Sequence, residues 1–145
     1  MKIRVVADTN IYVAAALKPG GPTEFWLRVA ARPNGTFELF ASEPILVELR
    51  QKLLDKFSFT EGVASSFVDA IRESAAIVNP TERLPAGIIG DPDDVIVLEC
   101  AIEARANLIV SADRDLLRLD PLRGIGITHP RELKSIFRSD LAQST

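Results

Sequence analysis

Short apolar runs rich in β-branched residues alternate along this chain with longer segments whose apolar residues recur at helical spacing. The run at residues 3–8, IRVVAD, has the composition of a strand that is buried on both faces, as strands of parallel sheets are. Strands that alternate with helices are joined by right-handed crossovers, which place helices on both faces of a parallel sheet. The pattern therefore predicts an α/β fold with a central parallel sheet.

Turn residues and helix caps divide the chain into individual elements. Ser42 and Thr60 stand where side-chain caps of helices are expected, and residues 80–90, with a Pro and a Gly inside them, predict a loop. The predicted strands are residues 3–8, 36–42, 75–79, 107–111 and 124–128, and the predicted helices are residues 10–17, 22–32, 43–57, 62–74, 91–106, 113–119 and 130–138.

Four acidic residues stand where apolar elements begin or end, and these are Asp8, Glu48, Asp94 and Asp113. In open α/β sheets, ligands bind beyond the carboxyl ends of the strands, where Asp8 and Asp113 are expected. Two unit charges about 4 Å apart repel by about 4 kcal/mol at an effective dielectric constant of about 20. If the fold gathers these acids, they need raised pKa values or a bound cation.

Each acid also has a structural interpretation that the sequence leaves open. Asp8 and Asp113 can cap the helices that follow them, and Asp115 can support the first turn after Asp113. Asp91 before Pro92 is a good helix N-cap, and acids in the following turn complement the helix dipole. Glu48 lies away from the apolar stripe of its helix, which favours a solvated position.

Size, charge and composition narrow the class of protein. The chain has 145 residues, of which 47% are hydrophobic and 26% are charged, as is usual for a globular domain. We therefore expect one domain over residues 1–138 and a frayed tail over 139–145. The net charge of −3 argues against a general nucleic-acid coat, and no apolar stretch is long enough to span a membrane. No leader precedes the first strand, and the single Cys100 indicates a buried thiol, so we expect a cytoplasmic protein.

Four segments stand out in order along the chain: ADTN, SEPILVELR, DPDDVIVLECAIEARANLIVSADRDLL and THPREL. Taken together in their order and spacing, they closely resemble the PIN-domain family, and most closely its bacterial VapC-like toxin branch. The resemblance covers nearly the whole chain. The third segment, with its acid, apolar helix, short strand and S-x-D-x-D-L-L, is the most specific.

This resemblance implies a three-layer α/β/α domain, a metal-dependent endoribonuclease activity, a small antitoxin protein that blocks the site, and a homodimer or higher oligomer. The acidic quartet of the family matches Asp8, Glu48, Asp94 and Asp113. Further polar positions of the family match Asn10, Asp91, Ser111 and Asp115.

The mechanism expected from this match is hydrolysis of RNA phosphodiesters with one or two Mg²⁺ or Mn²⁺ ions, which prefer oxygen ligands. Asp8 is the expected central ligand, and Asp94 and Asp113 complete the metal site. Glu48 is expected to orient or deprotonate the attacking water. Asn10 and Ser111 are expected to hold these groups by hydrogen bonds.

Other functions are weighed against this one. A haloacid-dehalogenase-like phosphatase expects a second acid two residues after Asp8, where this chain has Asn10. A receiver domain expects an acidic pair after the first strand and a Lys after the fifth, where this chain has Thr128 and His129. A catalytically inactive PIN-like interaction module stays open as the main alternative.

Overall fold

A five-stranded sheet, parallel throughout, forms the centre of the protein in a computed structural model that describes residues 2–85 and 87–133. The chain runs from the central strand β1 outward through β2 to β3, then returns past β1 to β4 and β5. The strand order is therefore β3-β2-β1-β4-β5. Strands are added on one side of β1 up to β3 and on its other side from β4 onward, and the boundary between β1 and β4 is called the reversal point below. The strands are β1 (Ile3–Ala7), β2 (Phe37–Ser42), β3 (Ala76–Val78), β4 (Leu108–Val110) and β5 (Gly126–Thr128).

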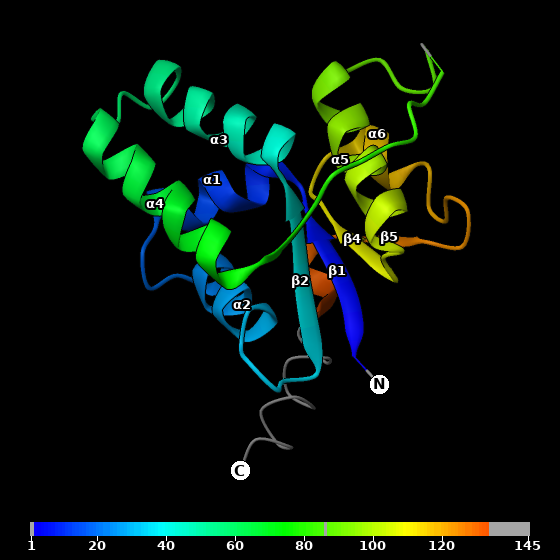
Figure 1. The fold of residues 1–145 in the computed structure, drawn as a ribbon, viewed down its shortest axis with the longest axis horizontal. Coiled ribbons are helices and arrows are strands. Elements are labelled where there is room, and N and C mark those ends of the chain that lie inside the picture. Colours follow the sequence, from blue (N-terminus) through cyan, green and yellow to red (C-terminus); the bar gives the residue numbers. More distant parts are fainter. Residues whose placement is uncertain (1, 86, 134–145) are drawn as a thin grey trace.

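Helices flank both faces of this sheet, which makes the three-layer α/β/α sandwich that was expected (Figure 1). Helix α5 packs against β1, β2 and β3, whereas α2 and α3 pack against β2, and α4 packs on α3. The helices are α1 (Thr9–Leu17), α2 (Pro22–Ala30), α3 (Glu43–Asp55), α4 (Glu61–Ser74), α5 (Pro92–Ala104) and α6 (Arg114–Leu117).

The central strand is buried because its neighbours and the helices cover it on every side. Val5, Val6 and Ala7 have no exposed surface, and Ile109 and Val110 of β4 are equally buried. These residues are the β-branched and small apolar types that suit a parallel sheet covered on both faces. The β1 and β4 backbones are thereby held in fixed register, with Ala7 opposite Val110.

The predicted caps begin α3 and α4. The Ile45 N–H donates to Ser42 Oγ at 3.4 Å, and the Val63 N–H donates to Thr60 Oγ1 at 3.3 Å. Arg105 adopts left-handed backbone geometry with φ of 51°, which ends α5. The alternation of strands and helices is confirmed for the described residues, with boundaries shifted by a few positions.

The closing element differs from its prediction. A helix was expected over residues 130–138, but residues Pro130–Leu133 form a 3₁₀ helix in which the Glu132 N–H donates to the His129 carbonyl at 3.0 Å. Such i→i+3 bonds are common in short terminal turns. The rest of that prediction, the domain end at 138 and the tail 139–145 lie outside the described residues.

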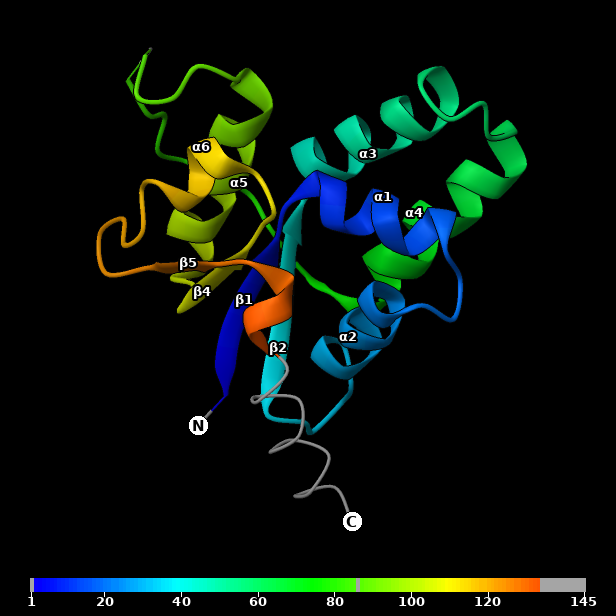
Figure 2. The same cartoon turned by 180° about the vertical axis from the view of Figure 1, so that it is seen from behind.

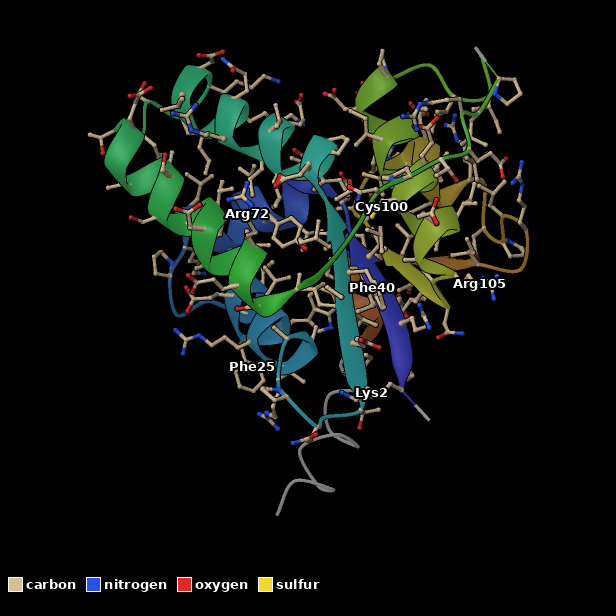
Figure 3. The ribbon with its side chains drawn as sticks, viewed as in Figure 1. Lys2, Phe25, Phe40, Arg72, Cys100 and Arg105 are labelled. Carbon is tan, nitrogen blue, oxygen red and sulfur yellow. The ribbon has the colours of Figure 1, made fainter. Side chains whose placement is uncertain are left out.

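The thiol of Cys100 lies on the face of α5 that packs against the sheet (Figure 3). It is fully buried, as predicted, and burial raises its pKa to about 12. In the described part of the chain, no helix is both long and apolar enough to cross a membrane.

Candidate metal centre

The site begins where β1 and β4 end side by side, at the point where the strand order reverses (Figure 2). Asp8 directly follows β1, and its N–H donates to the Val110 carbonyl at 3.0 Å, which continues the strand pairing by one residue. Ser111 directly follows β4 and is fully buried. The sheet register therefore brings Asp8 and Ser111 together, although they are 103 residues apart in sequence.

A single hydroxyl fixes two of the acids. Ser111 Oγ donates to Asp8 Oδ2 at 2.8 Å and accepts the Asp113 N–H at 2.9 Å. Asp113 in turn begins α6 as its N-cap, because its Oδ1 accepts the Asp115 N–H at 2.8 Å. The serine expected to donate to the acids occupies this position, and the capping interpretation of Asp113 is also correct.

The third acid comes from the opposite side of the site, from the first turn of α5. Asp94 is 3% exposed and Asp8 is 4% exposed. One carboxylate oxygen from each of Asp8, Asp94 and Asp113 lies within 4.8 Å of the other two. These three residues are called the triad below. Asp94 Oδ2 is buried and has no hydrogen-bond partner among the residues that the structure describes.

Crowding and burial make the triad costly to ionise. The pKa of Asp94 is raised to about 7, first by burial and then by the negative charges of Asp113, Asp8 and Asp91. The pKa of Asp8 is raised mainly by burial, against hydrogen bonds from Ser111 and the Asn10 N–H that lower it. At neutral pH the triad therefore carries negative charge, of which the nearby Lys52 offsets only a part, since the pKa of Asp8 stays raised.

The triad fits a hard divalent cation. Its ligand atoms are all carboxylate oxygens, which Mg²⁺ and Mn²⁺ favour, whereas softer metals favour sulfur and nitrogen ligands. The unpartnered Asp94 Oδ2 is a buried acceptor that gains a partner if an ion binds between the three residues. A cation would also relieve the repulsion that raises the pKa of Asp94.

Glu48 is not part of the triad and is linked to it through Lys52, whose charge lowers the pKa of Asp8. Its Oε1 lies 3.7 Å from the Nζ of Lys52, one turn further along α3. The same Nζ lies 3.7 Å from Asp93 Oδ2 on α5 and donates to Asn10 Oδ1 at 3.4 Å. The pKa of Glu48 is raised by burial and by Asp93, and lowered by Lys52.

The remaining expected residues take local structural positions. The Asp91 side chain accepts the Asp93 N–H at 2.9 Å and caps α5. The Asp115 side chain is exposed and lies 3.5 Å from Arg118. The Asn10 N–H reaches Asp8 Oδ1 at 3.5 Å, the limit of a hydrogen bond, so its amide backbone supports Asp8 weakly.

Two residues at the site were missed by sequence reasoning. No motif in the sequence singles out Lys52, and Asp93 is one of the acids that follow the expected N-cap Asp91. The i,i+4 spacing of Glu48 and Lys52 is a signal for an ion pair on one helix. No sequence pattern reports that Asp93 of α5 approaches the same ammonium group. His129 makes a local contact, since its Nδ1 accepts the Arg131 N–H at 3.2 Å.

Comparisons with known proteins match most of the chain. A family model described as PIN domain matches residues 4–115. An uncharacterized protein of Methanocaldococcus jannaschii, MJ1680, is 28% identical over 123 residues, which cover 82% of this chain and 76% of that protein.

Two solved structures share the fold. VapBC2 from Rickettsia felis, bound to a DNA fragment from its promoter, superposes with a TM-score of 0.64 and 17% identity, covering 88% of this chain and 98% of that one. VapBC-1 from nontypeable Haemophilus influenzae superposes with a TM-score of 0.59 and 15% identity, covering 89% and 99%. At these identities, the likeness shows the fold.

Proposed function

Because this chain belongs to the PIN-domain family, we propose that it is a divalent-metal-dependent endoribonuclease, the toxin of a type II toxin–antitoxin pair. The observation that carries the proposal is the triad. Its three carboxyl groups converge at the reversal point of the sheet, and two of them are almost fully buried. A buried group of like charges with a perturbed pKa is a common mark of a functional site.

The triad residues hold the ion in this proposal, as Mg²⁺ or Mn²⁺. A divalent ion bound there supplies positive charge for the attacked phosphate and for the leaving oxygen. Asp8 is the central ligand, because it directly follows the central strand β1 and is oriented by Ser111. Ser111 keeps Asp8 Oδ2 in place, whereas Oδ1 has only the weak contact from the Asn10 N–H at 3.5 Å and is available to the ion.

Glu48 acts on the attacking water from the flank of α3. Burial and Asp93 raise the pKa of its carboxyl group, which makes the carboxylate a stronger base near neutral pH. Asn10 and Lys52 limit the orientations that this side of the site can adopt. Water is the nucleophile, so the proposal needs no Ser or Cys nucleophile with a histidine base.

The proposed partner is a small antitoxin protein that covers the triad. The VapBC names of the two solved structures with this fold support that partner. We propose in addition that the protein forms a homodimer or a higher oligomer, that it acts in the cytoplasm, and that residues 1–138 form one nuclease domain. Co-purification with the product of an adjacent small reading frame, followed by light scattering, tests the partner and the oligomeric state.

The function is tested by cleavage of defined single-stranded RNAs with the purified full chain. We expect cleavage with Mg²⁺ or Mn²⁺, loss of cleavage with excess chelator, and recovery when the metal is restored. Calorimetric titration with Mn²⁺ accompanies the assay. Binding of Mn²⁺ without cleavage of any RNA points to the inactive interaction module, and cleavage that persists in chelator overturns the metal-dependent mechanism.

A site directed at phosphate does not by itself distinguish RNA from DNA. The assay therefore includes single-stranded DNA of the same sequences at the same metal concentrations. We expect RNA to be cleaved faster, and equal rates would replace the endoribonuclease assignment with a general nuclease.

A further inference from the structure

The ammonium group of Lys52 lies at the meeting point of three elements beside the triad. Its Nζ is 3.4 Å from Asn10 Oδ1 at the start of α1, 3.7 Å from Glu48 Oε1 on α3, and 3.7 Å from Asp93 Oδ2 on α5. The Lys52 side chain is 12% exposed, far less than the cations on the outer helices. Its charge also reaches Asp8, whose pKa it lowers.

These contacts differ from an ordinary surface ion pair. Lys52 Nζ is close to equidistant from three oxygen atoms, and all three distances exceed the usual hydrogen-bond length of about 2.7–3.2 Å. The ammonium group therefore acts as a positive centre shared by several acceptors, which a compact point charge on a long stem can do. The two acids that it contacts, Glu48 and Asp93, both lie outside the triad.

We infer that Lys52 is a built-in cation of the site, so that the protein binds one divalent ion at the triad and not a pair. The inference rests on the proposed function, because it assumes that the triad binds a metal. In sites with two metals, the ions stand about 3.5–4 Å apart and share neighbouring acids as ligands. Here Glu48 and Asp93, the acids available for a second ion, already face the Lys52 ammonium group.

Lys52 is a positioning residue in this view. Its ammonium group contacts Glu48 at 3.7 Å and so limits the directions that the Glu48 carboxylate can take. It also repels a second divalent ion from the space between α3 and α5. Removing the ammonium group leaves two carboxylates and the Asn10 carbonyl oxygen near one another, which is an oxygen set that suits Mn²⁺.

The test is the stoichiometry of Mn²⁺ binding to the purified full chain, measured by electron paramagnetic resonance of the free ion and by calorimetry. The wild type should bind one ion per chain. Lys52→Met should bind two, and Lys52→Arg, which keeps the positive charge, should bind one. Two ions in the wild type, or one ion in Lys52→Met, overturn the inference.

Arg50→Met is the matched control on the same helix. It removes an equal charge, but Arg50 NH2 lies 3.1 Å from Glu61 Oε1 and its Nε donates to Ser65 Oγ at 3.3 Å, both on α4. This variant should keep one ion per chain, and a gain equal to that of Lys52→Met would mean that net charge alone sets the count. Lys52→Gln replaces Lys52→Met if circular dichroism shows that the latter does not fold, with the same expected gain.

Failure of the inference and failure of the proposed function give different results. If the wild type binds no Mn²⁺, the metal-dependent function fails together with the inference. If the wild type binds one ion, Asp94→Asn loses it and Lys52→Met gains none, the function stands and the role of Lys52 does not.

Discussion

Two groups of acids on this protein differ in whether a cation balances their charge. On the outer surface of α3 and α4, two acids lie against one cation: Arg72 on α4 (Figure 3) contacts Glu43 at 2.8 Å and Asp69 at 2.7 Å. These three residues are called the α3–α4 surface below. At the triad, Asp94 keeps a buried oxygen without a partner among the described residues. The pKa of Glu43 is lowered, chiefly by hydrogen bonding to Arg72, whereas the pKa of Asp94 is raised to about 7.

This difference shows which acids have their charge balanced without a bound ligand. Glu43 and Asp69 are exposed and paired with Arg72, so these acids need no further partner. The triad is buried and crowded, and its negative charge has no balancing partner within the triad. Local disagreement with the rules of stable packing is expected at functional sites. The predictions below compare matched changes in these two regions.

The largest expected effect is on cleavage. Asp8→Asn keeps the size of the side chain but removes a charged ligand from the triad, and we expect the rate to fall by about a thousandfold or more, since a bound metal supplies several kcal/mol to such reactions. Glu43→Gln makes the same acid-to-amide change on the α3–α4 surface and should leave the rate within about twofold. Metal-dependent cleavage of a defined RNA measures both, and comparable losses in the two variants would remove the distinction.

The second expected effect concerns Ser111, which orients Asp8 and receives the Asp113 N–H. Ser111→Ala should weaken Mn²⁺ binding or cleavage by about 10–100-fold, the range for residues that hold metal ligands. Ser65→Ala is the control, because Ser65 accepts a bond from Arg50 between α3 and α4. Calorimetry with Mn²⁺ should show normal affinity for Ser65→Ala; equal affinities in the two variants would show that Ser111 serves the fold alone.

The third effect is on stability without metal. The Asp94 carboxyl group has a pKa of about 7 in the folded chain against a reference of 3.8, so the folded state holds the proton more tightly. Its contribution to stability is complete below about pH 4 and is lost as the pH rises through about 7. The melting temperature of the metal-free protein should therefore fall between pH 5 and 8 through this group.

Asp94→Asn should remove that dependence and raise the free energy of unfolding at pH 8 by about 2 kcal/mol, after allowance for water near the site. Glu43→Gln should show the opposite sign, since a lowered pKa stabilises the fold above the unfolded value and that gain is lost as the pH falls. Chemical unfolding at both pH values in chelator measures the two variants. A triad variant that is less stable than the wild type at pH 8 contradicts the picture of unbalanced charge.

The strands and caps could be predicted from sequence because they depend on local patterns. The run before Asp8 and the Ser42 cap need only neighbouring residues, and both predictions are confirmed. Asp8 and Asp113 could be grouped because the carboxyl ends of parallel strands share one edge of the sheet. The site residues as a set remain predictions, although the structure brings Asp8, Asp94 and Asp113 together.

The positions of Glu48 and Lys52 could not be predicted from the sequence, because they depend on how α3 and α5 approach each other. The periodicity of α3 gives the face on which Glu48 lies, but not the direction of that face relative to the sheet. The contact of Lys52 with Asp93 joins two helices that are separated by α4 and β3 in the chain. The pattern of apolar residues also could not distinguish an α-helix from the 3₁₀ helix at Pro130–Leu133. That distinction depends on the local backbone geometry, which gives the bond from the Glu132 N–H to the His129 carbonyl.

The smallest expected effect comes from the α3–α4 surface itself. Arg72→Met removes the cation that contacts Glu43 and Asp69, yet exposed ion pairs contribute little, so the melting temperature should fall by no more than about 3 °C. Cleavage and Mn²⁺ affinity should match the wild type. A large loss of stability would show that this surface contributes strongly to the fold. A loss of cleavage would show that it is coupled to the triad through α3.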